Sequence, residues 1–352
     1  MTETTIRESA PPPLAGLGWK RPFLMLVLFG AATWFLLPRL VHANPLSSLR
    51  SLRWPLVAAA LVAQAASQWG RALLLHGVIV GNGGTMTRRR ATQVLLAASS
   101  LGLLGGAFAG YAAALYRWSR SGGATVPGAL LASWLPSLLF SAAVLLIALI
   151  ALIAGVSVSS AGFLSDGEWI GAAVSVLLVL LPFAGLWWVI RNPARGPRLL
   201  KGIERVWSTL RRRPANTAGI EEKARKLNLA WSSMSSRTWG ALAGFAMFSA
   251  LCDASSVSLL LAAARVPLGI GAAFAAWGIP HLLGNASMLP GGAGVVEATM
   301  TPGLARLGVP AAEALLVVLA YRALAFWTPL VGGLPFIAWL ERRYVPAPSG
   351  GT

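Results

Sequence analysis

Four ionisable residues stand inside long apolar runs, and they are the first candidates for chemistry in this chain. Arg71, Asp253 and Arg322 each interrupt a run that is otherwise free of charge, and Glu297 follows a glycine-rich break. A charged side chain at the centre of a bilayer costs about 3 kcal/mol or more, so such residues mark substrate or ion pathways by default. Their mixed signs predict ion pairs at membrane depth. We expect these residues to bind a substrate through their charges, and we assign no catalytic residue.

The run Leu289–Glu297 is the most specific local feature. Its break is made by one proline and three glycines, Pro290, Gly291, Gly292 and Gly294. A helix that starts near Ala293 would direct free N–H groups into a cavity, which suits a phosphate group. Glu297 lies in the first turn of that helix, where it either stabilises the helix dipole or meets a cationic headgroup or an arginine. We favour the second role, with Arg322 as the natural counter-charge.

Asp253, His281 and Asn285 also belong to the predicted substrate-binding set. Asp253 lies in the middle of a span and can pair with Arg71 or with Arg322, and a purely structural ion pair is an equal alternative. His281 and Asn285 lie in the same apolar segment as the glycine-rich break. Both side chains can hydrogen-bond a ligand, although packing is the simpler explanation for His281.

Composition decides the class of protein that must position these residues. Of the 352 residues 56% are hydrophobic and 11% charged, whereas soluble domains contain about 25% charged residues. This excludes a soluble enzyme and a disordered chain. One Cys and three scattered His exclude a disulfide framework and a zinc motif, so we expect no metal and no cofactor. The chain is therefore predicted to be an all-α, polytopic membrane protein.

The charge excess predicts topology. The chain has 29 basic and 11 acidic residues, and no nucleic-acid-binding motif is present. In a membrane protein such an excess indicates cytoplasmic loops that face anionic lipid. The loop 191–237 holds 12 of the basic residues against 3 acidic ones, so we place it in the cytoplasm and expect it to include an amphipathic helix on phospholipid headgroups.

The chain divides into five parts. They are a disordered N-terminal tail (1–18), a first membrane half (19–190), the basic loop (191–237), a second membrane half (238–343) and a C-terminal tail (344–352). The N-terminal tail lacks the apolar core and cleavage site of a signal peptide. At about 20 residues per crossing, we expect about six full spans, over 22–38, 54–76 or beyond, 129–154, 169–190, 239–264 and 311–340.

Two glycine-rich segments, 91–116 and 269–307, are predicted to be re-entrant hairpins. The first has basic residues on both flanks, which places both its ends in the cytoplasm. The second has to enter from the opposite side for the C-terminus to be cytoplasmic like the N-terminus. The two halves then form an inverted repeat, which is typical of transporters. The alternative is two ordinary spans that pack closely through small residues, as in the spaced glycines Gly102, Gly106 and Gly110.

Three C-terminal motifs resemble the lysylphosphatidylglycerol synthase transmembrane-region family. They are the run Leu289–Glu297, the sequence Leu-Gly-Val-Pro at 307–310 and the segment 319–327 with its Tyr-Arg pair. The resemblance is good over 239–340 and weaker over 55–190, where Gly102–Gly110 and Leu130–Leu138 lack the polar and charged residues common in the family. By this resemblance Glu297 and Arg322 occupy recurrent charged positions. It implies a bacterial inner-membrane protein like the flippase half of the multiple peptide resistance factor, without the soluble synthase domain.

Two functions follow from these observations. The first is a flippase that moves a phospholipid, such as aminoacylated phosphatidylglycerol, between leaflets. The alternative is a non-transporting subunit that binds or regulates a separate lipid-modifying enzyme through the basic loop. The sequence offers no nucleophile–base pair, which makes a membrane-embedded enzyme the least favoured function. We expect membrane phospholipids as partners and no nucleic acid, with a homodimer and a separate lipid-modifying enzyme left open as protein partners.

Overall fold

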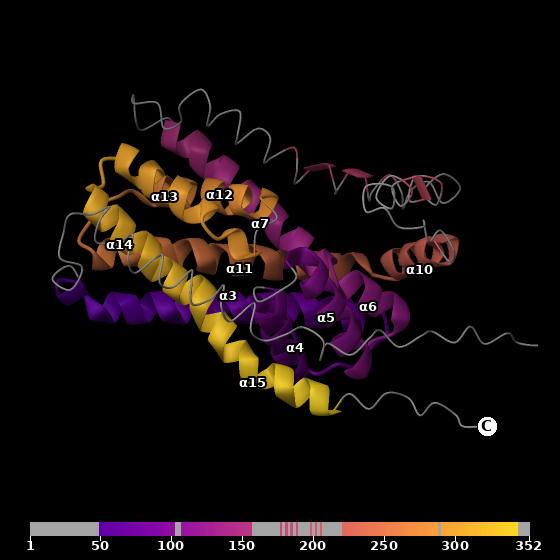
Figure 1. The fold of residues 1–352 in the computed structure, drawn as a ribbon. Coiled ribbons are helices and arrows are strands. Elements are labelled where there is room, and N and C mark those ends of the chain that lie inside the picture. The colour runs from indigo at the N-terminus through magenta and orange to yellow at the C-terminus, as the bar shows by residue number, and fades with distance from the viewer. Residues whose placement is uncertain are drawn as a thin grey trace, which may run out of the picture.

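A computed structural model describes residues 49–102, 107–156, 220–287 and 290–343, with scattered positions between 177 and 205. Every regular element in these ranges is helical, which confirms the all-α prediction (Figure 1). The predicted tails, the expected span over 22–38 and most of the one over 169–190 lie outside the described residues.

The first half contributes five described helices. They are α3 (Trp54–Gly81), α4 (Arg88–Leu101), α5 (Ala107–Ser121), α6 (Val126–Ala132) and α7 (Leu135–Val156). Two threonines cap helix N-termini: Thr87 accepts the Arg90 N–H at the start of α4, and Thr125 accepts the Gly128 N–H at the start of α6. Such caps satisfy backbone donors that have no partner inside the helix.

The second half repeats this order of a long helix, a helical hairpin and a long helix. After α10 (Ile220–Ser232) in the basic loop, the elements of this half are α11 (Ser236–Ala263), α12 (Ile270–Ala286), the short turn η3 (Pro290–Gly292), α13 (Val295–Arg306), α14 (Ala311–Arg322), the π-helical η4 (Ala323–Trp327) and α15 (Thr328–Arg343). The last three join end to end, so the predicted span over 311–340 is one long helix with a π-turn inside it.

Three segments of the described chain are long and apolar enough to cross a membrane. They are Val126–Ala151, Ser236–Ala263 and Ala311–Arg342. They overlap the predicted spans over 129–154, 239–264 and 311–340. The prediction of one helix over 129–154 was wrong in detail, because the chain breaks between α6 and α7 just before Pro136. Proline lacks an N–H and clashes with the carbonyl four residues earlier, so a helix restarts there.

The centre of the fold is the contact between α3 and α11, which lie side by side in Figure 1. The two backbones approach closely because small residues face one another. A Cβ at Gly70 would lie only 3.0 Å from the Ser249 Cβ, and the Ser67 and Ser249 hydroxyls are 3.1 Å apart. Close approach through small residues is how helices associate where water supplies no driving force.

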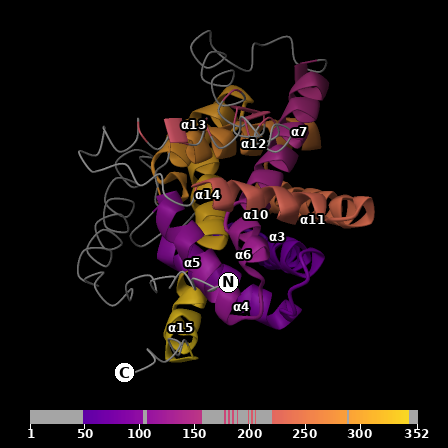
Figure 2. The same cartoon turned by 90° about the vertical axis from the view of Figure 1, so that its right-hand side faces the viewer.

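One helix of each half packs against the other half. Helix α7 of the first half packs on α12 of the second, and α15 of the second half packs on α4 of the first. A glycine sits at each contact: a Cβ at Gly278 would meet Ala148, and one at Gly333 would overlap Ser100 and Leu96. Figure 2 shows α7 and α15 leaving the bundle at opposite ends.

Both glycine-rich segments double back on themselves. Helices α4 and α5 pack together, and the Thr85 N–H donates to the Gly123 carbonyl at 3.1 Å, so the two flanks of the first segment meet. Helices α12 and α13 also pack together, and near the turn between them Gly284 lies against Gly292. With 14 and 15 residues, α4 and α5 are each shorter than the about 20 residues of a full crossing.

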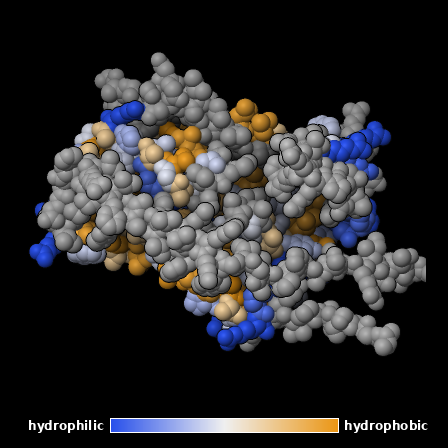
Figure 3. All heavy atoms as spheres, viewed as in Figure 1, coloured by the Kyte–Doolittle hydropathy of each residue, from blue (hydrophilic) through white to orange (hydrophobic). Residues whose placement is uncertain are grey.

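Within the basic loop the structure describes helix α10, over Ile220–Ser232. Its Leu227 and Trp231 pack against the core, and the Trp231 ring lies 4.3 Å from that of Trp239. Arg225 and Leu229 are exposed. In the face shown in Figure 3, strongly hydrophilic described residues gather mostly toward the ends of the molecule, with apolar side chains between them.

Candidate functional site

A buried carboxylate at the α3–α11 contact organises the first part of the site. Asp253 of α11 is 1% exposed. Its Oδ1 accepts hydrogen bonds from Gln64 Nε2 at 2.8 Å and from the Tyr321 hydroxyl at 2.9 Å, and its Oδ2 accepts from Arg71 Nη2 at 2.9 Å. The Tyr321 oxygen in turn accepts the Trp277 indole N–H at 3.1 Å. Helices α3, α11 and α14 therefore meet at one carboxylate, and α12 is joined to it through the Tyr321 hydroxyl.

Arg71 is the partner of Asp253, which decides between the two partners that the sequence allowed. Its guanidinium also stacks over the Phe140 ring of α7, with 3.8 Å to the ring centroid. The side chain is 27% exposed, whereas that of Asp253 is 2% exposed. The buried Nε of Arg71 makes no hydrogen bond within the described residues. This cation therefore keeps unused hydrogen-bonding capacity next to its ion pair.

The second part of the site is the ion pair predicted between Glu297 and Arg322. Arg322 Nε donates to Glu297 Oε1 at 2.7 Å, and Arg322 Nη1 donates to the Gly291 carbonyl at 3.0 Å. The other carboxylate oxygen of Glu297 accepts the Gly294 N–H at 2.8 Å, so it caps its own helix, α13. Both roles considered for Glu297 from sequence are therefore present in one side chain.

The glycines of the break serve this geometry. Gly291, Gly292 and Gly294 all have positive φ, at 59°, 64° and 84°, a region that glycine adopts without steric cost. The turn points the Gly291 carbonyl at Arg322 and lets Gly292 lie against Gly284, where a Cβ would approach the Gly284 Cα to 2.8 Å. Because Glu297 already occupies the first turn of α13, that helix terminus is less open to a phosphate than the sequence suggested.

The two ion pairs expose opposite charges. In the first pair the acid is buried and the base, Arg71, is 27% exposed; in the second the base, Arg322, is 8% exposed and the acid, Glu297, is 20% exposed. A buried charge with a close partner holds its partner in place, because breaking the pair leaves an uncompensated charge. The site as a whole is neutral, yet it offers one accessible cation and one accessible anion.

His281 and Asn285 lie on α12 beside this cluster. The His281 ring packs against those of Trp277 and Phe140, with centroids 5.4 and 5.7 Å away. The packing role foreseen for His281 therefore has direct support. Asn285 is exposed, and its Nδ2 is 3.4 Å from the Ser141 Oγ of α7. The substrate-binding role of both residues stays a prediction.

Four members of the cluster were not singled out from sequence: Gln64, Phe140, Trp277 and Ser256, whose Oγ accepts a hydrogen bond from Gln64 Nε2 at 2.8 Å. A signal existed for two of them. Gln64, Ser67 and Arg71 follow at spacings of three and four along α3, and Ser249, Asp253 and Ser256 do so along α11. Residues at these spacings share one helix face, so each long helix carries a polar stripe inside an apolar run. The aromatic members gave no comparable signal, because aromatic residues are common in any apolar helix.

A third ion pair joins α5 to the end of α15. Arg117 Nη2 donates to Glu341 Oε2 at 3.0 Å, and the Trp118 indole N–H donates to Glu341 Oε1 at 3.2 Å. Arg90 of α4 stacks on Trp339, with 4.8 Å to the ring centroid. These contacts anchor α15 outside the central cluster, which makes Glu341 a useful reference for Glu297.

A comparison with protein families shows which family the chain belongs to. A family model described as "Lysylphosphatidylglycerol synthase TM region" matches residues 23–333. The chain belongs to this family. It is therefore a membrane domain of the lysylphosphatidylglycerol synthase type, a class of proteins concerned with membrane lipids. A search of curated proteins gives no match to the chain.

The match places both ion pairs inside the family domain, because Arg71, Asp253, Glu297 and Arg322 all lie within residues 23–333. Among the described residues no group of His, Cys, Asp or Glu is arranged to hold a metal ion. The cluster consists of charged and hydrogen-bonding side chains around the two ion pairs.

Proposed function

We propose that this chain moves a phospholipid headgroup between the two leaflets of a membrane. One observation carries the proposal: two ion pairs, centred on four helices and a hairpin turn, expose one cation and one anion at the depth of apolar helices. Arg71 would meet the phosphate of the headgroup, and Glu297 would meet an amine. A headgroup that carries both groups, such as that of an aminoacylated phosphatidylglycerol, fits this pair of charges.

Membrane energetics support a role in translocation. A headgroup that crosses the apolar core must exchange water for protein partners, since unpaired polar groups in hydrocarbon cost several kcal/mol. Arg71 and Glu297 are held by Asp253 and Arg322, so a headgroup can replace part of each pair without leaving a bare charge. In this mechanism the protein supplies binding alone, and no bond is made or broken.

We further propose that the two helical hairpins are re-entrant and enter from opposite leaflets. The doubling back of each hairpin and the reciprocal packing of the two halves support this arrangement, which is typical of alternating-access transporters. The corresponding location is a bacterial inner membrane, with both termini and the basic loop in the cytoplasm. Helix α10, with exposed Arg225 and Leu229, would then rest on anionic headgroups.

The orientation has a direct test. Single cysteines are introduced beside Arg89 and beside Gly284 in a chain whose Cys252 is replaced by serine. A membrane-impermeant thiol reagent should label them from opposite faces. Labelling of both from one face would contradict the inverted arrangement.

Translocation is tested by reconstituting the full chain into vesicles that contain a fluorescent aminoacylated phosphatidylglycerol. The rate at which a membrane-impermeant quencher removes the inner-leaflet signal reports flipping. Losing one charge-assisted hydrogen bond costs about 1.5–3 kcal/mol, so Glu297→Gln should slow flipping about tenfold or more. Glu341→Gln is the matched control, because it neutralises a carboxylate in an ion pair outside the cluster.

The competing function has a distinct signature. If the chain only binds or regulates a separate lipid-modifying enzyme through its basic loop, neither the wild type nor Glu297→Gln will flip lipid faster than protein-free vesicles do, and Glu297→Gln will keep the regulatory function. Neutralising Arg225 and Lys226 on α10 would then abolish function. Far-UV circular dichroism of each variant shows whether the helical fold is kept, so an unfolded variant is not mistaken for an inactive one.

A further inference from the structure

A pocket of about 240 Å³ lies at the end of the molecule where α11, α12, α13 and α14 begin or end. Two connecting turns form its walls, and Glu313 in the first turn of α14 completes it. The residues of the two turns are Ala264, Arg265, Val266, Pro267 and Leu268, and Leu307, Gly308, Val309 and Pro310. This pocket contains no residue of the central cluster.

The two turns are copies of one backbone motif. At the end of α11 the N–H groups of Arg265 and Val266 donate to the carbonyls of Ala262 and Leu261, at 3.1 and 3.0 Å. At the end of α13 those of Gly308 and Val309 donate to Ala305 and Leu304 in the same pattern, at 3.0 and 3.2 Å. A proline follows each turn. This is a Schellman motif, whose central residue adopts a left-handed conformation.

Arg265 is the anomaly in this pair of turns. Gly308 takes the left-handed position of its turn with φ 85°, as expected, but Arg265 takes the same position with φ 61°. Among the described residues it is the one non-glycine with positive φ. A side chain there carries a steric cost that glycine avoids, and strained positions that persist cluster at binding and active sites. The exposed guanidinium is thus held at the pocket by an unfavourable backbone.

The opposite charge in the pocket comes from Glu313, which is half-buried. No ion pair or hydrogen bond of its carboxylate is found within the described residues. Its ordinary role is to stabilise the first turn of α14, and Arg265 likewise suits a helix C-terminus. Both charges nevertheless line one cavity whose remaining walls are mainly Val, Leu and Pro. A ligand in it would meet an anion-binding group and a cation-binding group at once.

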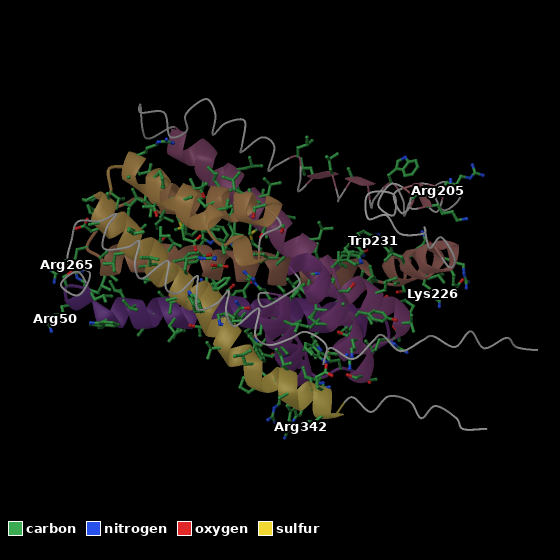
Figure 4. All side chains as sticks on the ribbon, in the orientation of Figure 1. Arg50, Arg205, Lys226, Trp231, Arg265 and Arg342 are labelled. Atoms are coloured by element: carbon green, nitrogen blue, oxygen red, sulfur yellow. The ribbon has the colours of Figure 1, made fainter. Side chains whose placement is uncertain are left out.

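The position of the pocket indicates the source of its ligand. Two candidate membrane spans, Ser236–Ala263 and Ala311–Arg342, have ends that adjoin it. The end of a span lies at the level of the lipid headgroups. Figure 4 shows Arg265 at one end of the bundle near Arg50, and Lys226 at the opposite end.

We propose that this pocket binds a zwitterionic phospholipid headgroup, with its phosphate on Arg265 and its primary amine on Glu313. The pocket volume of about 240 Å³ leaves room for a small headgroup, since a cavity of about 150 Å³ accommodates benzene. The site is separate from the Arg71–Glu297 cluster, and binding here does not depend on lipid translocation.

The test measures binding to the purified full chain in detergent by microscale thermophoresis. The probes are short-chain phosphatidylethanolamine, short-chain phosphatidylglycerol and free glycerophosphoethanolamine. We expect the amine-bearing lipid to bind about tenfold more tightly than phosphatidylglycerol, since a charged hydrogen-bonding partner contributes on this scale. Weaker binding of the free headgroup identifies a membrane lipid as the ligand. Equal binding identifies a soluble phosphoamine of the same chemistry.

Arg265→Gly is the decisive variant, because glycine is the residue that this backbone favours. It should keep or raise the unfolding temperature while weakening the binding of both lipids about tenfold. Glu313→Gln should weaken only the amine-bearing lipid, so that the preference between the lipids is lost. Arg50→Gln, an exposed arginine at the same end outside the pocket, is the control and should bind both lipids as the wild type does.

Three results would overturn the proposal. They are wild-type affinity in Arg265→Gly, an unchanged lipid preference in Glu313→Gln, and equal binding of the two lipids by the wild-type chain. All measurements are repeated in a Glu297→Gln background, which removes the proposed translocation site. Persistence of the preference in that background shows that the pocket acts on its own, whatever the flipping assay finds.

Discussion

The ion pair between Asp253 and Arg71 yields a quantitative prediction. Asp253→Asn keeps an oxygen that accepts from Gln64 and Tyr321, but it removes the charge opposite Arg71. Removing one member of a buried pair costs about 3–5 kcal/mol. The Arg71 side chain is 27% exposed and lies 3.8 Å above the Phe140 ring. Both features stabilise the Arg71 cation after its partner is removed. We therefore expect Asp253→Asn to lower the free energy of unfolding by about 3 kcal/mol, the lower limit of this range.

The double variant Asp253→Asn/Arg71→Met separates the pair from its surroundings. Replacing both members of a buried pair by uncharged groups is often neutral, so this variant should be more stable than Asp253→Asn alone. Such non-additivity is the signature of a direct interaction. The assay is unfolding of the full chain by SDS in mixed micelles, followed by far-UV circular dichroism.

The size of the coupling can refute this reasoning. Hydrogen bonds between membrane helices measured by double-mutant cycles average about 0.6 kcal/mol. A coupling of that size would mean that Asp253 and Arg71 behave as an ordinary polar contact, and that Arg71 finds water or lipid headgroups when it is abandoned. A coupling of about 2 kcal/mol or more would support a charge held at membrane depth.

Two further predictions concern packing and pH. Gly333→Ala should destabilise the fold by about 1–3 kcal/mol, because its Cβ would overlap Ser100 and Leu96; Gly332→Ala, whose Cβ meets nothing within 4 Å, is the matched neutral control in the same SDS titration. The hydrogen bond from Arg225 lowers the pKa of Glu222 below its ordinary 4.5. The ion pair between these two residues therefore stabilises the fold fully above pH 4.5, and this stabilisation is lost as the pH falls through the lowered pKa. The difference in unfolding temperature between the wild type and Glu222→Gln should therefore shrink on acidification, and a constant difference would contradict this role.

Much of the helical order could be predicted from composition and periodicity, because a helix in an apolar environment satisfies its own backbone. The expected spans over 239–264 and 311–340 correspond to α11 and to the continuous helix α14–α15. The break at Pro290, Gly291, Gly292 and Gly294 also fell where expected, since glycine and proline act locally. The boundary between α6 and α7 was missed, although Pro136 marks it, because the apolar run around it reads as one continuous span.

The candidate cluster was only partly predictable. The pairing of Glu297 with Arg322 followed from opposite charges in neighbouring segments, and the structure confirms it. The choice of Arg71 over Arg322 as the partner of Asp253 could not be read from the sequence, because both arginines lie in apolar runs. It depends on the crossing of α3 and α11, which small residues at Gly70 and Ser249 set.

Sequence by itself determined that this is an apolar helical protein with a few costly charges inside it, and that its chain breaks at Pro290, Gly291, Gly292 and Gly294. These properties depend on residue type and on neighbours in the chain. Only the tertiary structure decided which charge meets which, and that each pair buries one member and exposes the other. It also placed Arg265 and Glu313 in one pocket, because their meeting depends on how four helix ends pack rather than on any local sequence signal.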